Sequence, residues 1–445
     1  MSAVTVQEVR SAVAERLAGW APAPTGEIER RALARRLAEE VLDERARRDL
    51  GLGAVPPSIE DDAVVVEDVL SALFGLGRLQ RLVDDQSVEN IDVNGCDSAW
   101  VTYADGTKED LGPVAESDAE LIDLVRSAAG RFGLSERRFD AAQPELDLRL
   151  PDGSRLSAVM SVTKRPVLDI RRHRLSDHTL GDLVELGAVD ETLAGFLAAA
   201  VRAKQNILVS GAMNAGKTTL LRALAAEIPP DERLVTIEQA LELGLDEQVD
   251  RHPDCVAMEA RLPNTEGAGG IGVAQLVRRS LRMNASRVIV GEVLGDEVVP
   301  MLNAMSQGRS GSMATIHADS SAGVFRRLAT YAVQAPERLP LEATNLLIAG
   351  SVHLVVHLNL HRASDNAPQR PRGRLAPVAD HALRRRVASV REVVDADGPL
   401  VVSNEIWRPG PGGRALPGSP ASERTRDALA AAGYDWSEID VGVSW

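Results

Sequence analysis

Aromatic residues are scarce in this chain of 445 residues, since Phe, Trp and Tyr together contribute only 3%. A hydrophobic core must therefore consist mostly of Leu, Val, Ile and Ala, and an apolar content of 44% is enough to build one. Cysteine is also rare. Cys96 and Cys255 lack the CxxC spacing of a metal site and cannot form a disulfide framework. A reducing cytosol is the expected compartment.

Basic residues are in the minority, with 50 Lys and Arg against 65 Asp and Glu, so the formal net charge is −15. This balance argues against nucleic acid as the main ligand, because chains that grip nucleic acid usually carry a basic surface. No apolar run approaches the roughly 18 residues of a membrane-spanning helix, and the N-terminus lacks the apolar segment of a secretory signal. We expect a cytoplasmic protein whose contact with a membrane is made through a partner.

The length predicts two or three domains. Residues 1–60 predict a peripheral helical segment and linker, with a charged helix over 27–50. Residues 61–175 alternate helix and strand patterns and predict an N-terminal α/β domain. Residues 176–360 repeat a strand–helix rhythm and predict a parallel α/β domain. Residues 361–445 predict a C-terminal extension with a loop, a hairpin and a helix.

Positive charge gathers locally in this acidic chain. Between residues 126 and 174 there are eleven Lys or Arg and only six Asp or Glu. From the residues alone, an anion-binding surface and a solvated basic face are equally good interpretations of this basic island.

A phosphate-binding loop is the strongest motif. The stretch GAMNAGKT at 211–218 fits the pattern GxxxxGK[ST], follows an apolar strand predicted over 206–210 and opens a helix predicted over 219–228. In such loops backbone N–H groups surround phosphate oxygens, the lysine contacts the β- and γ-phosphates, and the hydroxyl binds Mg²⁺. The residues expected to hold ATP are Gly211, Ala212, Met213, Asn214, Ala215, Gly216, Lys217, Thr218 and Thr219.

Polar side chains follow three further apolar strands. Glu238 ends the run 234–237, Glu292 ends 288–291, and His317 ends 313–316. Because open α/β sheets bind ligands at the C-terminal ends of their strands, we expect these side chains near the phosphate loop. Phosphoryl transfer needs a carboxylate near Mg²⁺ and a group that orients water, and these residues could supply both.

Four stretches resemble, in order, the Walker A, Asp-box, Walker B and His-box motifs of the secretion ATPase superfamily of type II secretion, type IV pili and type IV secretion. They are SGAMNAGKTT, RLVTIEQALEL, RRSLRMNASRVIVGE and GRSGSMATIHADS. The stretches LPDGSRLSAV and SVENIDVNG also resemble the N-terminal domain of its CpaF/TadA branch, which serves tight-adherence pili. The likeness covers about residues 64–360.

The resemblance implies an α/β protein with an N-terminal α/β domain, a RecA-like P-loop NTPase domain and a C-terminal extension. It also implies ATP as substrate, Mg²⁺ as cofactor, and a homohexameric ring at the inner face of the cell membrane. The ring would dock on an inner-membrane platform protein and drive the movement of pilin or of a secreted substrate.

The resemblance assigns roles to the site residues. Glu292 would be the Walker B glutamate, which activates water or holds Mg²⁺ together with Thr218. Glu238 would be the acid of the Asp-box, and His317 would sense the γ-phosphate.

Arginines from outside the P-loop domain complete the implied site. Arg155 and Arg171 match positions at which family members reach the nucleotide, and this would explain the basic island without nucleic acid. Three residues in or next to the Asp-box, Walker B and His-box stretches depart from the usual pattern: Arg309 replaces a His, Gln239 an Asp and Leu294 an Arg. Within the phosphate loop, Met213-Asn214 also replaces a more usual Thr-Gly. An active but slow or differently regulated ATPase is therefore expected.

Other functions remain open at this point. The same fold could serve a type IV secretion system that transfers DNA or protein effectors. The three departures would also suit a weakly hydrolysing or non-hydrolysing scaffold. A small-molecule kinase is a further alternative, although it would leave the His-box and the N-terminal domain unexplained.

Overall fold

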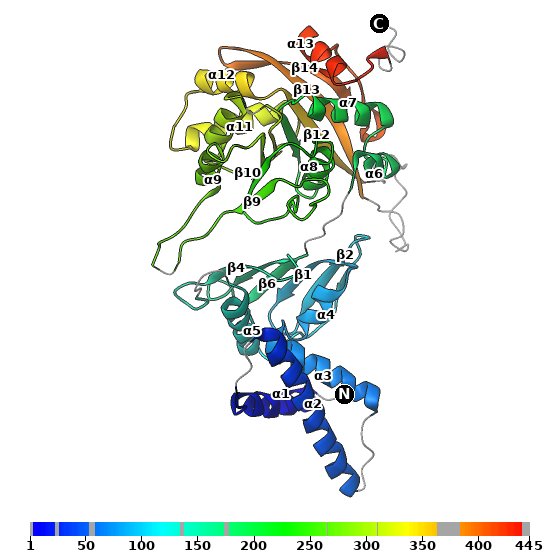
Figure 1. Cartoon of the computed structure of the whole chain (residues 1–445), viewed down its shortest axis with the longest axis vertical. Coiled ribbons are helices and arrows are strands. Elements are labelled where there is room, and N and C mark those ends of the chain that lie inside the picture. Colours follow the sequence, from blue (N-terminus) through cyan, green and yellow to red (C-terminus); the bar gives the residue numbers. More distant parts are fainter. Residues whose placement is uncertain are drawn as a thin grey trace, which may run out of the picture. The chain divides into compact units, whose positions relative to one another are not determined.

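The computed structural model divides the chain into two units, Met1–His173 and Arg174–Trp445, which are described separately (Figure 1). The residues that the structure describes are 3–22, 26–52, 58–133, 138–172, 178–264, 266–308, 310–362 and 383–437. Most of the Pro/Arg-rich loop predicted at the start of the C-terminal extension lies outside these ranges. None of the helices in the described ranges is both long and apolar enough to cross a bilayer.

Three helices open the first unit: α1 (Ala3–Ala18), α2 (Glu27–Gly51) and α3 (Ile59–Phe74). The charged helix predicted over 27–50 is present as α2. The Ser58 side chain accepts a hydrogen bond from the Asp61 N–H, and the Asp61 carboxylate accepts one from the Ser58 N–H, so a capping box starts α3. The helices share a small apolar core that includes Val13, Leu37 and Leu70.

A six-stranded antiparallel sheet forms the rest of the first unit. Its strands are β1 (Val88–Asn94), β2 (Ala99–Tyr103), β3 (Lys108–Asp110), β4 (Glu145–Arg149), β5 (Arg155–Val159) and β6 (Val167–Arg171). The spatial order is β3-β2-β1-β6-β5-β4, and the helices α4 (Leu79–Asp84) and α5 (Asp118–Phe132) accompany it. One face buries residues such as Ile91, Leu156 and Ile170 in a core that also contains Leu121 of α5. The other face carries many polar and charged side chains, among them Asp92, Ser157 and Asp169.

The second unit is built on a nine-stranded sheet. Its strands are β7 (Ile207–Gly211), β8 (Leu234–Glu238), β9 (Cys255–Glu259), β10 (Arg287–Val293), β11 (Met313–His317), β12 (Leu354–Arg362), β13 (Leu383–Asp397), β14 (Leu400–Pro409) and β15 (Ala415–Pro417). The spatial order is β15-β14-β13-β12-β7-β11-β10-β8-β9. The six strands from β12 to β9 are mutually parallel, whereas β13, β14 and β15 extend the sheet in antiparallel fashion.

Helices cover both faces of this sheet (Figure 1). The core on one face includes α6 (Leu180–Glu185), α7 (Glu191–Arg202), α8 (Lys217–Ala225) and α13 (Glu423–Ala431). The core on the other face includes α9 (Val273–Ser280), α10 (Val298–Ser306), α11 (Gly323–Gln334) and α12 (Leu341–Ser351).

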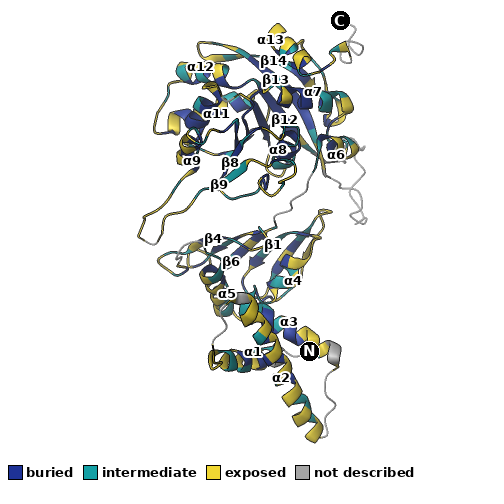
Figure 2. Ribbon diagram, in the orientation of Figure 1, coloured by how far each residue is buried: buried dark blue, intermediate teal, exposed yellow. Residues whose placement is uncertain are grey.

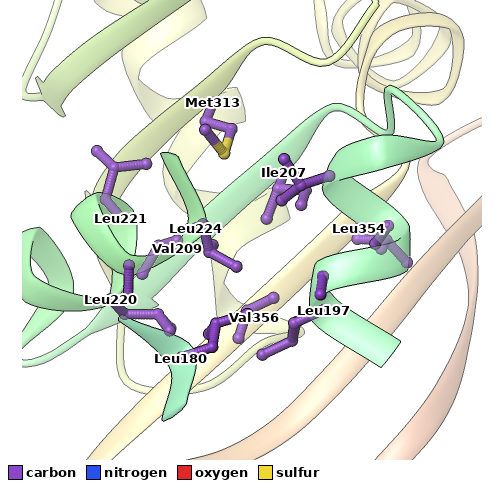
Figure 3. Close-up of a cluster of buried hydrophobic side chains, with 14 of the residues drawn as sticks. Leu180, Leu197, Ile207, Val209, Leu220, Leu221, Leu224, Met313, Leu354 and Val356 are labelled. Atoms are coloured by element: carbon purple, nitrogen blue, oxygen red, sulfur yellow. The ribbon is translucent and has the colours of Figure 1, made fainter. Parts of the chain in front are cut away.

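Successive side chains of a strand point to opposite faces of the sheet, so each central strand contributes residues to both cores. Ile207 and Val209 of β7 lie in the first, with Leu220 of α8 and Val356 of β12, as the close-up shows (Figure 3). Leu208 lies in the second. Strand β7 is buried along its whole length, and much of the interior of this unit is coloured as buried in Figure 2. Strands that are buried on both faces are mostly apolar, which explains the continuous apolar runs in the sequence.

The α/β fold class predicted from the sequence is confirmed. In the second unit, β11 lies between β7 and β10, so one strand separates the strand that precedes the phosphate loop from the strand that ends in Glu292. This insertion of β11 sets the arrangement of the site.

Candidate active site

The phosphate loop lies between β7 and α8. Its backbone takes two left-handed conformations, with φ of 60° at Asn214 and 91° at Gly216. A Cβ atom on Gly211 would lie only 2.8 Å from the carbonyl oxygen of Leu358, so a glycine is required where β7 ends. The loop leads into the first turn of α8, whose positive end and unpaired N–H groups favour an anion.

Lys217, the first residue of α8, is turned inward. Its side chain is only 8% exposed. The ammonium group donates to the carbonyl oxygen of Ala212 at 3.2 Å and to Nδ1 of His317 at 3.1 Å. It also lies 3.8 Å from Oε1 of Glu292. The structure thus brings together three of the residues that the sequence singles out.

Strand order explains this meeting. His317 at the end of β11 pairs with Gly211 at the end of β7, and Ile316 pairs with Val293 of β10. His317 therefore stands between the phosphate loop and Glu292. Its Nε2 lies 2.9 Å from Oε1 of Glu292.

The contacts of His317 define its tautomer. An ammonium group can only donate hydrogen bonds, so Nδ1 must accept from Lys217. The ring hydrogen is then on Nε2, which donates to the Glu292 carboxylate. A neutral imidazole consequently links the cation of Lys217 to the anion of Glu292.

Glu238 has different partners. It is 3% exposed, and its Oε1 accepts from the backbone N–H groups of Glu242 and Leu243, both at 3.0 Å. Burial raises the pKa of Glu238 to about 8, against the lowering effect of these two hydrogen bonds. A Cβ atom on Gly291 would lie 2.8 Å from Cγ of Glu238. The carboxyl group therefore packs against the residue that precedes Glu292.

The side-chain oxygens of Thr218, Thr219 and Glu292, near the phosphate loop, are suitable ligands for Mg²⁺. Thr218 and Thr219 lie in the first turn of α8 and are partly exposed, and the Glu292 side chain is 34% exposed. Across the described ranges, no group of three or more His, Cys, Asp and Glu could hold a metal. Because Mg²⁺ is commonly bound by one or two protein oxygens together with substrate phosphates, the residues present fit Mg²⁺ brought with a nucleotide.

The two predicted arginines lie in the first unit, next to a third. Arg155 of β5 pairs with Arg149 of β4 on one side and with Arg171 of β6 on the other. Directly paired residues of antiparallel strands share a face, so the three side chains form a cross-strand row. None of them makes a hydrogen bond or ion pair with another described residue. We call these residues the arginine row.

Other arginines of the basic island hold the first unit together. Arg165 contacts Asp118 through Nε at 2.9 Å and Nη2 at 2.7 Å, and it lowers the pKa of that carboxyl group. Arg131 donates to the carbonyl oxygens of Leu73 and Gly75. The island is therefore partly a structural feature, whereas the side chains of the arginine row make no such contacts among the described residues.

The departures from the motifs have separate locations. Gln239 is exposed, and Leu294 is 50% exposed. Arg309 lies outside the described residues.

One contact to the loop comes from a residue that no motif indicated. Nε of Arg385, near the start of β13, donates to the carbonyl oxygen of Asn214 at 2.9 Å. The sequence gives no local signal for it, because the two residues are 171 positions apart.

Comparisons with known proteins agree with the geometry. Residues 74–400 match the family described as type II/IV secretion system protein. A putative conjugal transfer protein of Mycobacterium tuberculosis is 36% identical over 330 residues, which are 72% of this chain and 88% of the relative. The type IV secretion system protein VirB11 of Brucella suis is 30% identical over 68% of this chain and 89% of its own.

A solved structure is also similar. The VirB11 ATPase from the Brucella suis type IV secretion system, determined in complex with sulphate, shares 27% identity. The match covers 72% of this chain and 97% of that one, with a TM-score of 0.36.

Proposed function

Because the chain belongs to the family of type II/IV secretion system proteins and is an ATP hydrolase of that family, we propose that it drives mechanical work for pilus assembly or secretion at the inner membrane. The observation that supports ATP hydrolysis best is the contact of Lys217, His317 and Glu292 beside a phosphate loop. A cation for the phosphates and a carboxylate for the attacking water are central needs of this reaction.

ATP would bind through its phosphates. The backbone N–H groups of the loop and the start of α8 favour anionic oxygens. Lys217 would exchange the Ala212 and His317 acceptors for oxygens of the β- and γ-phosphates. Because this side chain is 8% exposed, its charge acts where little water screens it.

Glu292 is proposed to take the proton of the attacking water. Its partial exposure leaves the carboxylate accessible, and the His317 N–H orients it. Thr218 and Glu292 offer oxygen ligands to Mg²⁺, which supplies neutralisation of phosphate charge when bound. Glu238 lies at the end of β8 and packs against Gly291, the residue before Glu292. We assign it the role of the acidic residue of the Asp-box.

His317 is proposed to sense the γ-phosphate. It touches both Lys217 and Glu292, so a phosphate that draws Lys217 away removes the hydrogen bond to Nδ1. The ring and the carboxylate can then reorient together. This coupling would link the arrival of the phosphate to activation of water.

The arginine row supports a further part of the proposal. Like charges on neighbouring strands repel one another, so Arg149, Arg155 and Arg171 suit an anionic ligand. We assign Arg155 and Arg171 to the phosphates of ATP, in a homo-oligomeric ring that is most simply a hexamer. Such a ring would be cytoplasmic, at the inner face of the membrane, and would contact an inner-membrane platform protein.

Two machines fit this activity. Assembly of a tight-adherence pilus, as in the CpaF/TadA branch, is favoured by the stretches LPDGSRLSAV and SVENIDVNG in the first unit. Type IV secretion is the second candidate, because two of the relatives are named a putative conjugal transfer protein and a type IV secretion system protein.

Substitution of Glu292 tests the proposed hydrolase. Glu292→Gln should retain Mg·ATP binding and lose at least about a hundredfold in turnover, because the amide cannot accept the proton from water. Asp296→Asn is the matched control, since this exposed carboxylate lies four positions away and should be dispensable. ATP affinity and phosphate release are measured on both variants. Unchanged turnover in Glu292→Gln would contradict the role, and a wild-type chain that binds ATP without hydrolysing it would favour a scaffold.

A further inference from the structure

The C-terminal hairpin brings the beginning of a strand to the phosphate loop. Within the sheet, Leu358 of β12 pairs with Gly211, the last residue of β7. Leu360, two residues further along β12, pairs with Arg385 of β13. The start of β13 therefore extends past the C-terminal edge of the parallel strands, on the side where the loop lies.

Arg385 contacts the phosphate loop through its guanidinium group and through its aliphatic stem. Nε donates to the carbonyl oxygen of Asn214 at 2.9 Å. A Cβ atom placed on Gly216 would lie 3.3 Å from Cδ of Arg385, so the aliphatic stem covers this glycine. The side chain is exposed, and the two terminal nitrogens have no partner among the residues that the structure describes.

The carbonyl group that Arg385 holds belongs to a residue in the left-handed region. Asn214 has a φ of 60°, which asparagine adopts more readily than most residues other than glycine, and the contact with Arg385 fixes the direction of its carbonyl group. In a trans peptide the C=O and the following N–H point in opposite directions. Holding the Asn214 oxygen from outside therefore directs the Ala215 N–H inward.

The inward direction is visible in the contacts of Ala215. Its N–H points to the carbonyl oxygen of Ala212 at 3.3 Å, and the same oxygen accepts from the Lys217 ammonium. This is the interior of the loop, where phosphate oxygens would replace these contacts. Arg385 thus helps to prepare a phosphate-binding N–H before any nucleotide arrives.

Strand β13 also contacts the segment that follows His317. Ser321, four residues after His317, accepts from Nε of Arg391 at 3.2 Å and from the Ser389 hydroxyl at 3.0 Å. Nη2 of Arg391 also donates to Glu405 of β14 at 2.9 Å. Strand β13 consequently connects the phosphate loop to the segment that follows His317.

We propose that Arg385 is a positioning residue for nucleotide binding, which holds the phosphate loop in the conformation that receives phosphates. The inference rests on the proposed function, because it takes a nucleoside triphosphate or diphosphate as the ligand. It also assigns a task to the C-terminal extension, where none of the ATPase motifs lies.

The neighbours of Arg385 supply matched controls. Successive residues of a strand point to opposite faces, so Arg384 and Arg386 lie opposite to Arg385. Arg386 donates to the carbonyl oxygen of Gly412 at 2.6 Å, and Arg384 is exposed. Arg384→Ala removes the same charge from the same strand without touching the loop.

Nucleotide affinity of the full-length chain tests the proposal. Arg385→Ala should weaken Mg·ADP binding and raise the KM for ATP on the order of tenfold, as expected for loss of one hydrogen bond from a charged donor. The effect on kcat should be smaller. Arg385→Lys should recover part of the affinity, and Arg384→Ala should bind like wild type. Thermal unfolding without nucleotide is measured on each variant.

Two results would overturn the proposal. One is equal Mg·ADP affinity in Arg385→Ala and Arg384→Ala. The other is a lowered unfolding temperature of Arg385→Ala with wild-type affinity, which would make the residue purely structural. A wild-type chain that binds Mg·ADP but never hydrolyses ATP would remove the proposed function instead, while the comparison of affinities would still decide the role of Arg385.

Discussion

One imidazole ring joins the charged groups of the site. His317 accepts from Lys217 through Nδ1 and donates to Glu292 through Nε2, so neither charge is buried alone. The sequence indicated these three residues because each ends a strand or opens a helix next to a strand end. It could not show their direct contact, since this depends on β11 lying between β7 and β10.

Removal of the lysine should abolish turnover. Lys217→Ala deletes a buried cation that is proposed to contact the β- and γ-phosphates, and loss of such a contact costs about 3 kcal/mol or more, a hundredfold in rate. Lys164→Ala, which removes an exposed lysine of the first unit, is the control. Phosphate release at saturating ATP measures both. Wild-type turnover in Lys217→Ala would exclude the loop as the site of hydrolysis.

Burial of Glu238 predicts a pH-dependent stability. Its pKa is raised from 4.5 to about 8, mainly by desolvation, so the unfolded chain releases this proton at a lower pH than the folded chain. The stabilisation is complete below about pH 4.5 and is lost as the pH rises toward 8. Glu238→Gln stays neutral, and its Oε1 can still accept from the N–H groups of Glu242 and Leu243.

The comparison uses urea unfolding at pH 5 and pH 8.5. The free energy of unfolding of wild type should fall as the pH rises. Glu238→Gln should reduce this fall by roughly 2 kcal/mol, which is less than the whole free energy that corresponds to the raised pKa of Glu238. Glu247→Gln, an exposed residue of the following loop, should leave the fall unchanged. The same pH dependence in Glu238→Gln and wild type would show that Glu238 titrates normally.

Among the elements, strands with a strong apolar pattern could be predicted and weakly patterned ones could not. The run at 206–210 became β7, which is buried on both faces. Strand β9 was missed although four of its five residues are apolar, because the run is short and only Val256 in it is a β-branched residue typical of strands. All five residues are half-buried at the sheet edge. The position of β13 beside the phosphate loop also lay beyond prediction, because strand pairing across distant segments leaves no local pattern.

The β4–β5–β6 sheet segment carries the arginine row, and substitution of its arginines tests their proposed role in hydrolysis. Arg155→Ala and Arg171→Ala should each lower kcat by at least about tenfold, because arginines that stabilise phosphate charge can be worth about a thousandfold in rate. Both side chains are exposed, so the unfolding temperature should change little.

Arg138→Ala is the control for the arginine row. This exposed arginine of the same unit pairs with Asp140 and should not affect hydrolysis. Equal turnover in all three variants would leave the row without a role in catalysis. A loss in Arg138→Ala as large as in Arg155→Ala would point to general destabilisation of the first unit.

In the whole molecule, the second unit carries the P-loop and the first unit carries the arginine row, whose side chains have no partner among the described residues. The family and the α/β class follow from motifs and apolar runs along the sequence. Assembly does not, because a ring depends on surfaces whose partners lie in other copies of the chain. If the arginine row acts only when units close on a nucleotide, hydrolysis becomes coupled to movement.

The most direct test of this account is the rate of phosphate release per chain, measured over a wide range of protein concentration with the mass of the particles determined in the same samples. We expect wild type to hydrolyse Mg·ATP, with a specific rate that rises as oligomers form, and Glu292→Gln to remain at background at every concentration. A wild-type chain that releases no more phosphate than Glu292→Gln would contradict the ATPase itself. A monomer with the same specific rate at all concentrations would contradict the mechanical ring.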